Sequence, residues 1–168
     1  MVVAIDGPAG SGKSTIARCV ARRLGVFFVN SGSLYRAVSY YVLRFDGDPE
    51  DRGNVIAALP DIDIDYTPDS LKLGGKELHE ELRSDDVDNW VSRHSAVPEV
   101  RHFVNDIIRR SVAGRDAVVE GRDMATVVFP DADYKFYLDA SLETRARRRM
   151  EAGAEGSLQE VMERIEER

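Results

Sequence analysis

The chain has 168 residues, 43% of them hydrophobic and 32% charged, with a formal net charge of −7 at pH 7. This composition excludes a disordered chain, no apolar run approaches the roughly 20 residues of a membrane-spanning helix, and the N-terminus lacks the basic start of a signal peptide. The acidic balance argues against a general nucleic-acid binder, and the single cysteine, Cys19, excludes an internal disulfide and fits a reducing cytoplasm.

The N-terminal region predicts alternating strands and helices. Residues 2–5 are a short β-branched run, typical of a buried strand, and a glycine-rich turn follows them. Apolar residues then recur with a helical period over 14–24, where Gly25 is a suitable C-cap. A second apolar run at 26–29 and a helix over about 34–45 complete a pattern that favours a βαβ unit and a parallel sheet.

The middle of the chain has a different pattern. From 61 to 82, apolar and polar residues alternate on both sides of the pair Gly74–Gly75, which predicts a small antiparallel hairpin or meander. Two helices are expected after it, at 85–94 and 98–113. We interpret this region as an insert on the parallel core.

The parallel pattern resumes after Gly114. Strands are predicted at 117–119 and 134–138, followed by a helix from Ser141 to Met150. The sequence Ser157-Leu158-Gln159-Glu160 is a capping box that opens one more helix. A doubly wound fold is expected to continue from there with a further strand and a closing helix.

The stretch from Gly7 to Ser14 has the spacing of a P-loop and lies between a predicted strand and a predicted helix. In such a loop, backbone N–H groups and the helix N-terminus converge on phosphate oxygens; the alternative is a chance glycine-rich turn. We expect Lys13 to span the β- and γ-phosphates of ATP and Ser14 to supply a hydroxyl to Mg²⁺. The predicted ATP-binding residues are Gly7, Pro8, Ala9, Gly10, Ser11, Gly12, Lys13, Ser14 and Thr15.

Polar residues also end the other predicted strands. Ligands of parallel α/β sheets lie beyond the carboxyl ends of the strands, so these residues predict an active site at one edge of the sheet. Glu120 is expected to hold Mg²⁺ through water, with a structural salt bridge as the alternative. The residues concerned are Asp6, Asn30, Ser31, Glu120, Arg122, Asp123 and Asp139, with Arg36 one turn into the second helix.

Four stretches resemble bacterial cytidylate kinases, which belong to the nucleoside-monophosphate kinases. They are the P-loop at 7–14, Ser31–Arg36, Ser92–Arg101 and Glu120–Pro130, and the resemblance extends over nearly the whole chain. The last stretch, Glu-Gly-Arg-Asp-Met-Ala-Thr-Val-Val-Phe-Pro, is the most specific of the four. No Asn-Lys-x-Asp segment, which a GTPase would need to read guanine, occurs in the sequence.

The resemblance implies an α/β P-loop kinase. Its core, a parallel sheet flanked by helices, is expected at 1–60 and 114–140. A small antiparallel-β and helical insert that binds the nucleoside monophosphate is expected at 61–113, and a helical lid at 141–168. The family continues past Arg168 with a further strand and helix, which we therefore expect to be missing from this sequence.

The resemblance also implies roles for individual side chains. Ser92, Arg101 and Asp123 match residues that read the cytosine ring, since an arginine can donate to N3 and a carboxylate can accept from the exocyclic amine. Arg36 and Arg122 match arginines that hold the monophosphate. From the residues alone, Ser92 would be a solvated helix residue and Arg101 a surface charge, while Arg36 and Arg122 suit a phosphate.

Further matches concern the acceptor loop and the lid. Ser31 and Tyr35 match the acceptor-site loop, although an aromatic residue can equally serve packing. Arg145 and either Arg148 or Arg149 are expected to close over ATP, although a run of arginines can be a solvated helical face. Arg168 matches a lid arginine that grips phosphate. The predicted catalytic residues are Lys13, Arg122, Arg145 and Arg148.

The function implied is the transfer of the γ-phosphoryl group of ATP, with Mg²⁺, to CMP or dCMP, giving CDP or dCDP. We expect a cytoplasmic monomer that binds neither nucleic-acid polymers nor membranes. Asn30 stands where the family usually has Asp, which removes one charge near the acceptor. Two alternatives remain: another small-metabolite kinase, such as a shikimate or dephospho-coenzyme A kinase, or a catalytically impaired nucleotide-binding module.

Overall fold

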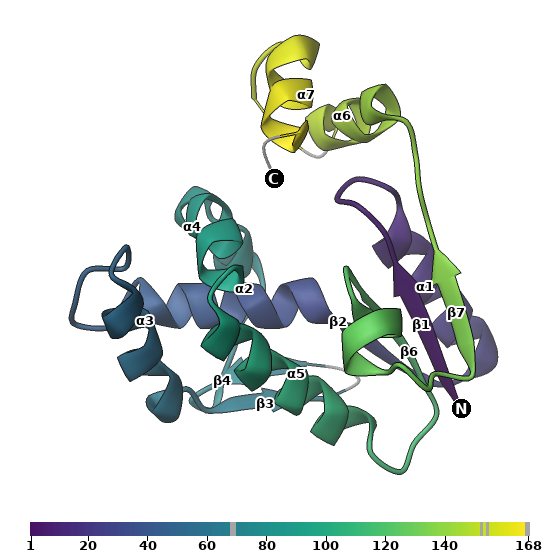
Figure 1. Cartoon of the computed structure of the whole chain (residues 1–168), viewed down its shortest axis with the longest axis horizontal. Coiled ribbons are helices and arrows are strands. Elements are labelled where there is room, and N and C mark those ends of the chain that lie inside the picture. The colour runs from purple at the N-terminus through teal and green to yellow at the C-terminus, as the bar shows by residue number, and fades with distance from the viewer. Residues whose placement is uncertain (68–69, 152, 154, 167–168) are drawn as a thin grey trace. The chain divides into compact units, whose positions relative to one another are not determined.

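The computed structural model describes residues 1–67, 70–151, 153 and 155–166 (Figure 1). The chain forms two compact units, Met1–Phe28 with Arg115–Arg168 and Val29–Gly114. The second unit includes residues 29–60, which the sequence pattern groups with the core, so the functional division at residue 61 stays a prediction. Within the described part of the chain, no helix is long and apolar enough to cross a lipid bilayer.

A four-stranded sheet is built from strands in the order β2-β6-β1-β7. Its central strand β1 pairs in parallel with β6 on one side and with β7 on the other, which confirms the predicted parallel sheet. Asp6, the last residue of β1, lies opposite Gly121 and Tyr137, so these strands end at one edge. The strand bounds are β1 Val2–Asp6, β2 Phe27–Asn30, β6 Ala117–Gly121 and β7 Tyr134–Tyr137.

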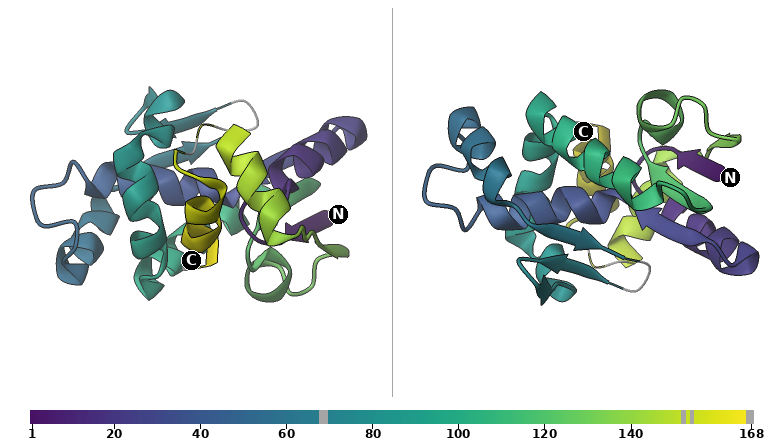
Figure 2. Two further views of the ribbon diagram at one scale, coloured as in Figure 1. Left: turned by 90° about the horizontal axis from the view of Figure 1, so that it is seen from above. Right: turned by 90° about the horizontal axis from the view of Figure 1, so that it is seen from below.

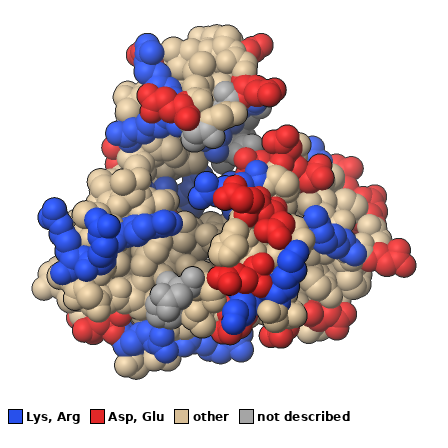
Figure 3. All heavy atoms as spheres, turned by 180° about the vertical axis from the view of Figure 1, so that it is seen from behind, with Lys and Arg blue, Asp and Glu red and all other residues tan. Residues whose placement is uncertain are grey.

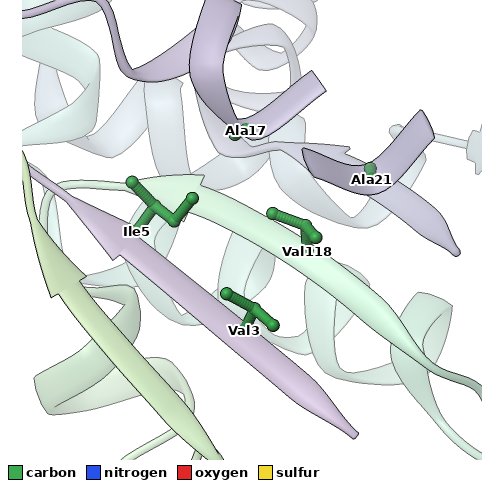
Figure 4. Close-up of a cluster of buried hydrophobic side chains, with 5 residues drawn as sticks. All are labelled: Val3, Ile5, Ala17, Ala21 and Val118. Carbon is green, nitrogen blue, oxygen red and sulfur yellow. The ribbon is translucent and has the colours of Figure 1, made fainter. Parts of the chain in front are cut away.

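Helix α1, Lys13–Leu24, covers this sheet through two small residues. Ala17 and Ala21 are one turn apart, so they lie on one face of the helix, and both pack against buried valine and isoleucine side chains of β1 and β6 (Figure 4). Gly25 ends the helix with φ +67°, as its predicted role as a C-cap requires. Alanine at both contact positions lets the helix backbone approach the sheet closely.

Two helices follow β7, and their caps were predicted correctly. The Ser141 hydroxyl accepts a hydrogen bond from the backbone N–H of Thr144 at 3.2 Å, and Ser157 and Glu160 bond reciprocally as a capping box. The helices lie side by side in Figures 1 and 2. Their bounds are α6 Leu142–Glu151 and α7 Leu158–Glu166, and the residues buried between them are Ala146, Val161 and Ile165.

The unit Val29–Gly114 contains the predicted antiparallel meander, with strands in the order β3-β4-β5. Helix α2 packs against α4 and α5, and α5 contacts β3. The buried side chains include Leu34, Val38, Val87, Val104 and Ile108. The elements are α2 Ser31–Val42, α3 Arg52–Ala58, β3 Ile64–Tyr66, β4 Leu71–Leu73, β5 Lys76–Glu77, α4 Asp85–Ser95 and α5 Pro98–Val112, with 3-10 turns at Leu59–Asp61 and Glu80–Arg83.

Helices α2 and α3 differ from the sequence prediction. Helix α2 begins at Ser31 rather than near residue 34, because the Asn30 side chain accepts a hydrogen bond from the backbone N–H of Ser33 at 3.1 Å and caps the helix there. The short helix α3 was not predicted. Its seven residues include a glycine and have too few turns for a clear apolar period, although Asp51 caps its first turn.

Candidate active site

The P-loop connects β1 to α1 and is tightly enclosed at two glycines. A Cβ atom on Gly7 would lie 2.0 Å from the carbonyl oxygen of Leu138, and one on Gly10 would lie 2.9 Å from that of Arg145. Gly10 also has φ +78°, a left-handed conformation that favours glycine. The end of β7 and helix α6 therefore lie directly against the loop.

Lys13 opens α1 and is buried, with 9% of its surface exposed. Its Nζ donates a hydrogen bond to the carbonyl oxygen of Pro8 at 2.8 Å, which holds the ammonium group across the loop. Burial lowers the pKa of Lys13, and the nearby carboxylate of Glu120 partly offsets this effect. An anionic ligand would strongly stabilise the charged form of this ammonium group, because the group has lost the water that would otherwise solvate it.

Glu120 is the penultimate residue of β6 and is almost fully buried, with 3% of its surface exposed. Burial raises the pKa of its carboxyl group, while hydrogen bonding with Ser14 and the charge of Lys13 act in the opposite direction. Its Oε1 has no hydrogen-bond partner among the described residues. An unpartnered buried carboxylate oxygen beside a serine hydroxyl fits a hydrated divalent cation.

The arginines of α6 divide into different environments. Arg148 Nη1 donates to the carbonyl oxygens of Ser11 at 2.9 Å and Gly10 at 3.3 Å, so its guanidinium lies on the P-loop. Arg147 instead pairs with Glu143 on the exposed face of the helix. The Nε atom of Arg145 is buried and has no hydrogen-bond partner among the described residues.

The turn after β6 carries Arg122 and Asp123, and it is held by a residue whose role sequence reasoning missed. The buried carboxylate of Asp6 accepts hydrogen bonds from the backbone N–H groups of Met124 and Ala125, both at 2.8 Å. The sequence indicated Asp6 only as a polar strand end. A carboxylate directly before the glycine loop was the available signal.

In the second unit, the predicted acceptor residues lie on α2, α4 and α5. Arg36 Nη1 donates to the carbonyl oxygen of Leu82 at 3.0 Å and forms an ion pair with Asp88, which sequence reasoning also missed. Asp88 precedes the exposed Ser92 by one turn of α4, so the two share a helix face. No local sequence pattern indicated Asp88, because 52 residues separate it from Arg36.

The predicted site residues thus form two groups, one in each unit. Within the first unit, the structure brings the P-loop together with Glu120 and Arg148. Arg168 lies outside the described residues. The first group contains residues 7–15, Glu120, Arg122, Asp123, Arg145 and Arg148, and the second contains Ser31, Tyr35, Arg36, Ser92 and Arg101.

Comparison with known proteins gives consistent matches. The family model described as cytidylate kinase matches residues 3–168. A cytidylate kinase of Caldanaerobacter subterraneus subsp. tengcongensis is 41% identical over 170 residues, which cover 99% of this chain and 76% of the relative. Those of Clostridium botulinum strain Langeland and Clostridioides difficile strain 630 are 39% and 38% identical, over 99% and 98% of this chain and 78% of each relative.

Among solved structures, an uncharacterized protein from Eubacterium ventriosum has a TM-score of 0.52 and 12% sequence identity. The match covers 99% of this chain and 70% of that protein. At this identity, the likeness concerns the fold alone.

Proposed function

Because this chain belongs to the cytidylate kinase family, we propose that it transfers the γ-phosphoryl group of ATP to CMP, giving ADP and CDP. The observation that carries this proposal is the family match over residues 3–168, which includes a P-loop whose lysine is buried within the loop. dCMP is proposed as a second acceptor. We further propose a cytoplasmic monomer, in keeping with the single cysteine.

The donor side of the reaction depends on charge and position. The P-loop N–H groups and Lys13 bind the β- and γ-phosphates, and Arg145 and Arg148 on α6 balance the charge of the group in transfer. An oxygen of the CMP phosphate forms a bond to the γ-phosphorus while the bond from that phosphorus to the β–γ bridging oxygen breaks. ADP leaves, and no strong base is needed.

Mg²⁺ is proposed to accompany ATP, with Ser14 and, through water, Glu120 as the protein groups that hold it. The buried, unpartnered Oε1 of Glu120 and the adjacent hydroxyl of Ser14 support this assignment. When bound, the cation supplies positive charge to the phosphate oxygens.

The acceptor side depends on hydrogen-bond polarity. Asp123 accepts from the exocyclic amine of cytosine, Arg101 donates to N3, and Ser92 contacts the ring edge. Uracil reverses the donor and the acceptor, so it would leave both side chains without a matching group. The monophosphate is assigned to Arg36 and Arg122. Ser31 and Tyr35 are assigned to the loop that holds the acceptor.

An assay of phosphoryl transfer across different acceptors tests this function. CMP should be the best acceptor, dCMP should be used as well, and UMP should be at least about tenfold poorer in kcat/KM. Preference for shikimate or dephospho-coenzyme A would support a different metabolite kinase. Binding of both ATP and CMP without turnover would support a nucleotide-binding module instead.

The variant Asp123→Ala tests the proposed base recognition. Loss of a carboxylate that accepts from the cytosine amine should weaken CMP binding by about 10- to 100-fold, because the amine is then desolvated without a partner. ATP binding, measured by calorimetry on the same preparation, should change by less than about threefold. The exposed Asp61 offers a matched control, since Asp61→Ala should leave both affinities unchanged. Equal losses for CMP and ATP would contradict the assignment.

A further inference from the structure

Asp6 is a buried carboxylate with no ion pair among the described residues. Only 4% of its surface is exposed, and its backbone leads directly into the P-loop at Gly7. Burying an ionised carboxylate is costly unless hydrogen bonds replace its lost water. Its two oxygens meet this need with the N–H groups of Met124 and Ala125, one for each oxygen, both at 2.8 Å.

The two N–H groups open an unusual turn. Met124–Val128 is a π-helical turn in which Val128 N donates to the carbonyl oxygen of Asp123 and Phe129 N to that of Met124, at 3.2 and 2.8 Å. The first N–H groups of a helical turn have no carbonyl partner within the turn. Asp6 fills that place from a position 118 residues away in sequence. Such turns are frequent at functional sites.

The two hydrogen bonds from Met124 and Ala125 to Asp6 are called the clamp below. The position of this clamp affects two neighbouring side chains. Arg122 and Asp123 stand between the end of β6 at Gly121 and the two clamped amides, so their backbone is held at both ends. At one end it is held by strand pairing, in which Gly121 lies opposite Asp6 itself. At the other end it is held by the Asp6 side chain. Asp6, which directly precedes the P-loop, therefore contacts the chain on both sides of this dipeptide.

We infer that Asp6 is a positioning residue that links the ATP-binding loop to the Arg122–Asp123 dipeptide, an inference that rests on the function proposed above. A carboxylate suits this task because both of its oxygens only accept. An asparagine would accept from one N–H group and turn its own amide donors toward the other. Replacing Asp6 should therefore weaken binding of the acceptor nucleotide, which Arg122 and Asp123 are proposed to contact, more than binding of ATP.

The first test needs no ligand. In the wild-type chain, the amide protons of Met124 and Ala125 should be protected from exchange with solvent, as measured by NMR. In Asp6→Asn, they should exchange at least about tenfold faster, since one bond is lost and the other is weakened. Unprotected amides in the wild type, or unchanged exchange in the variant, would overturn the clamp.

The second test is kinetic. Asp6→Asn should raise the KM for CMP by about tenfold or more and change the dissociation constant of ATP by less than about threefold. Asp51 provides a matched control, because its side chain also caps a helical turn by accepting from the backbone N–H of Asn54 at 3.0 Å. Asp51→Asn should lower the melting temperature slightly and leave both nucleotide constants unchanged.

The outcomes separate the two proposals. The positioning role would be overturned if amide exchange in Asp6→Asn became faster while the KM for CMP stayed unchanged. It would also be overturned if CMP binding and ATP binding were weakened equally, because Asp6 would then be a structural residue only. If the wild-type chain does not phosphorylate CMP, the proposed function fails, while the exchange experiment still decides the clamp. Should Asp6→Asn not fold, Asp6→Ser removes the same charge with less bulk and takes its place in both tests.

Discussion

Lys13, at the start of α1, and Glu120, near the end of β6, are buried side chains of opposite charge. Burial lowers the pKa of the lysine and raises that of the glutamate, so for both of them the ionised form is disfavoured without a ligand. The two charges attract each other, but this attraction is smaller than the effect of burial at each group. Charge buried in this way costs stability in the ligand-free protein.

Glu120→Gln should stabilise the ligand-free protein at neutral pH. Because the pKa of Glu120 is raised in the folded state, its ionised form destabilises that state above the ordinary pKa of about 4.5, and glutamine removes this cost. The melting temperature should rise at pH 7–8 by roughly 2–4 °C for each kcal/mol gained. The difference in melting temperature between the variant and the wild type should shrink as the pH falls toward about 4.5, because the wild-type carboxyl group then takes up a proton.

The same variant should bind ATP less tightly in the presence of Mg²⁺ and be less sensitive to removal of Mg²⁺ by EDTA. The exposed Glu151 provides the control, since Glu151→Gln should change neither stability nor Mg²⁺ dependence. A lower melting temperature for Glu120→Gln at pH 7–8, measured by calorimetry, would contradict the electrostatic account.

A buried histidine joins two helices and a loop in the unit Val29–Gly114. His94 of α4 is 2% exposed and lies 3.0 Å from both the hydroxyl of Ser39 on α2 and the carbonyl oxygen of Pro49. The carbonyl can only accept, so Nε2 carries the proton and donates to it, while Nδ1 accepts from the hydroxyl. Trp90 stacks on the imidazole ring with a centroid distance of 5.5 Å.

Stability should therefore depend on pH through His94. Burial lowers its pKa in the folded state, so the unfolded chain takes up a proton first as the pH falls below about 6.5. The free energy of unfolding should decrease from pH 7.5 to 5.5 by at most about 1.4 kcal/mol per pH unit from this group. His94→Gln should be less stable at pH 7.5 but should have a smaller pH slope. Equal slopes in urea titrations of the two proteins would contradict this prediction.

The charge of the molecule as a whole is acidic, although arginine is abundant: 19 of its 23 basic residues are arginine. Acidic and basic side chains both occur on the face that Figure 3 shows. Several of the arginines are engaged locally, such as Arg148 on the P-loop carbonyls and Arg147 with Glu143. These two arginines therefore make specific contacts within the protein.

A net charge of −7 should prevent binding of nucleic-acid polymers at physiological salt. Fluorescence anisotropy with a labelled 20-nucleotide single strand should show no saturable binding up to about 100 μM protein at 150 mM salt. Unlabelled CMP under the same buffer conditions should bind and raise the melting temperature by mass action. Saturable binding of the oligonucleotide at low micromolar protein would contradict this prediction.

Much of the fold was predictable because its signals are local. The parallel strands, the meander and the caps at Gly25, Ser141 and Ser157 each depend on residues within a few positions, where apolar period and capping chemistry act directly. The P-loop is local for the same reason, since one short loop supplies the backbone donors for phosphate. The short helix α3 and the π-helical turn Met124–Val128 were not predicted, because neither is long enough to show a period.

What folding alone decided is which distant groups meet. Asp6 reaches Met124 across 118 residues, and Arg36 reaches Asp88 across 52, and no local pattern encodes either pair. The P-loop was readable from eight consecutive residues, whereas the burial of Glu120 and the hydrogen bonds from Arg148 to the loop carbonyls depend on how β6 and α6 pack. Backbone propensity and side-chain period act over single turns, but desolvation and hydrogen-bond pairing depend on neighbours that only the folded chain supplies.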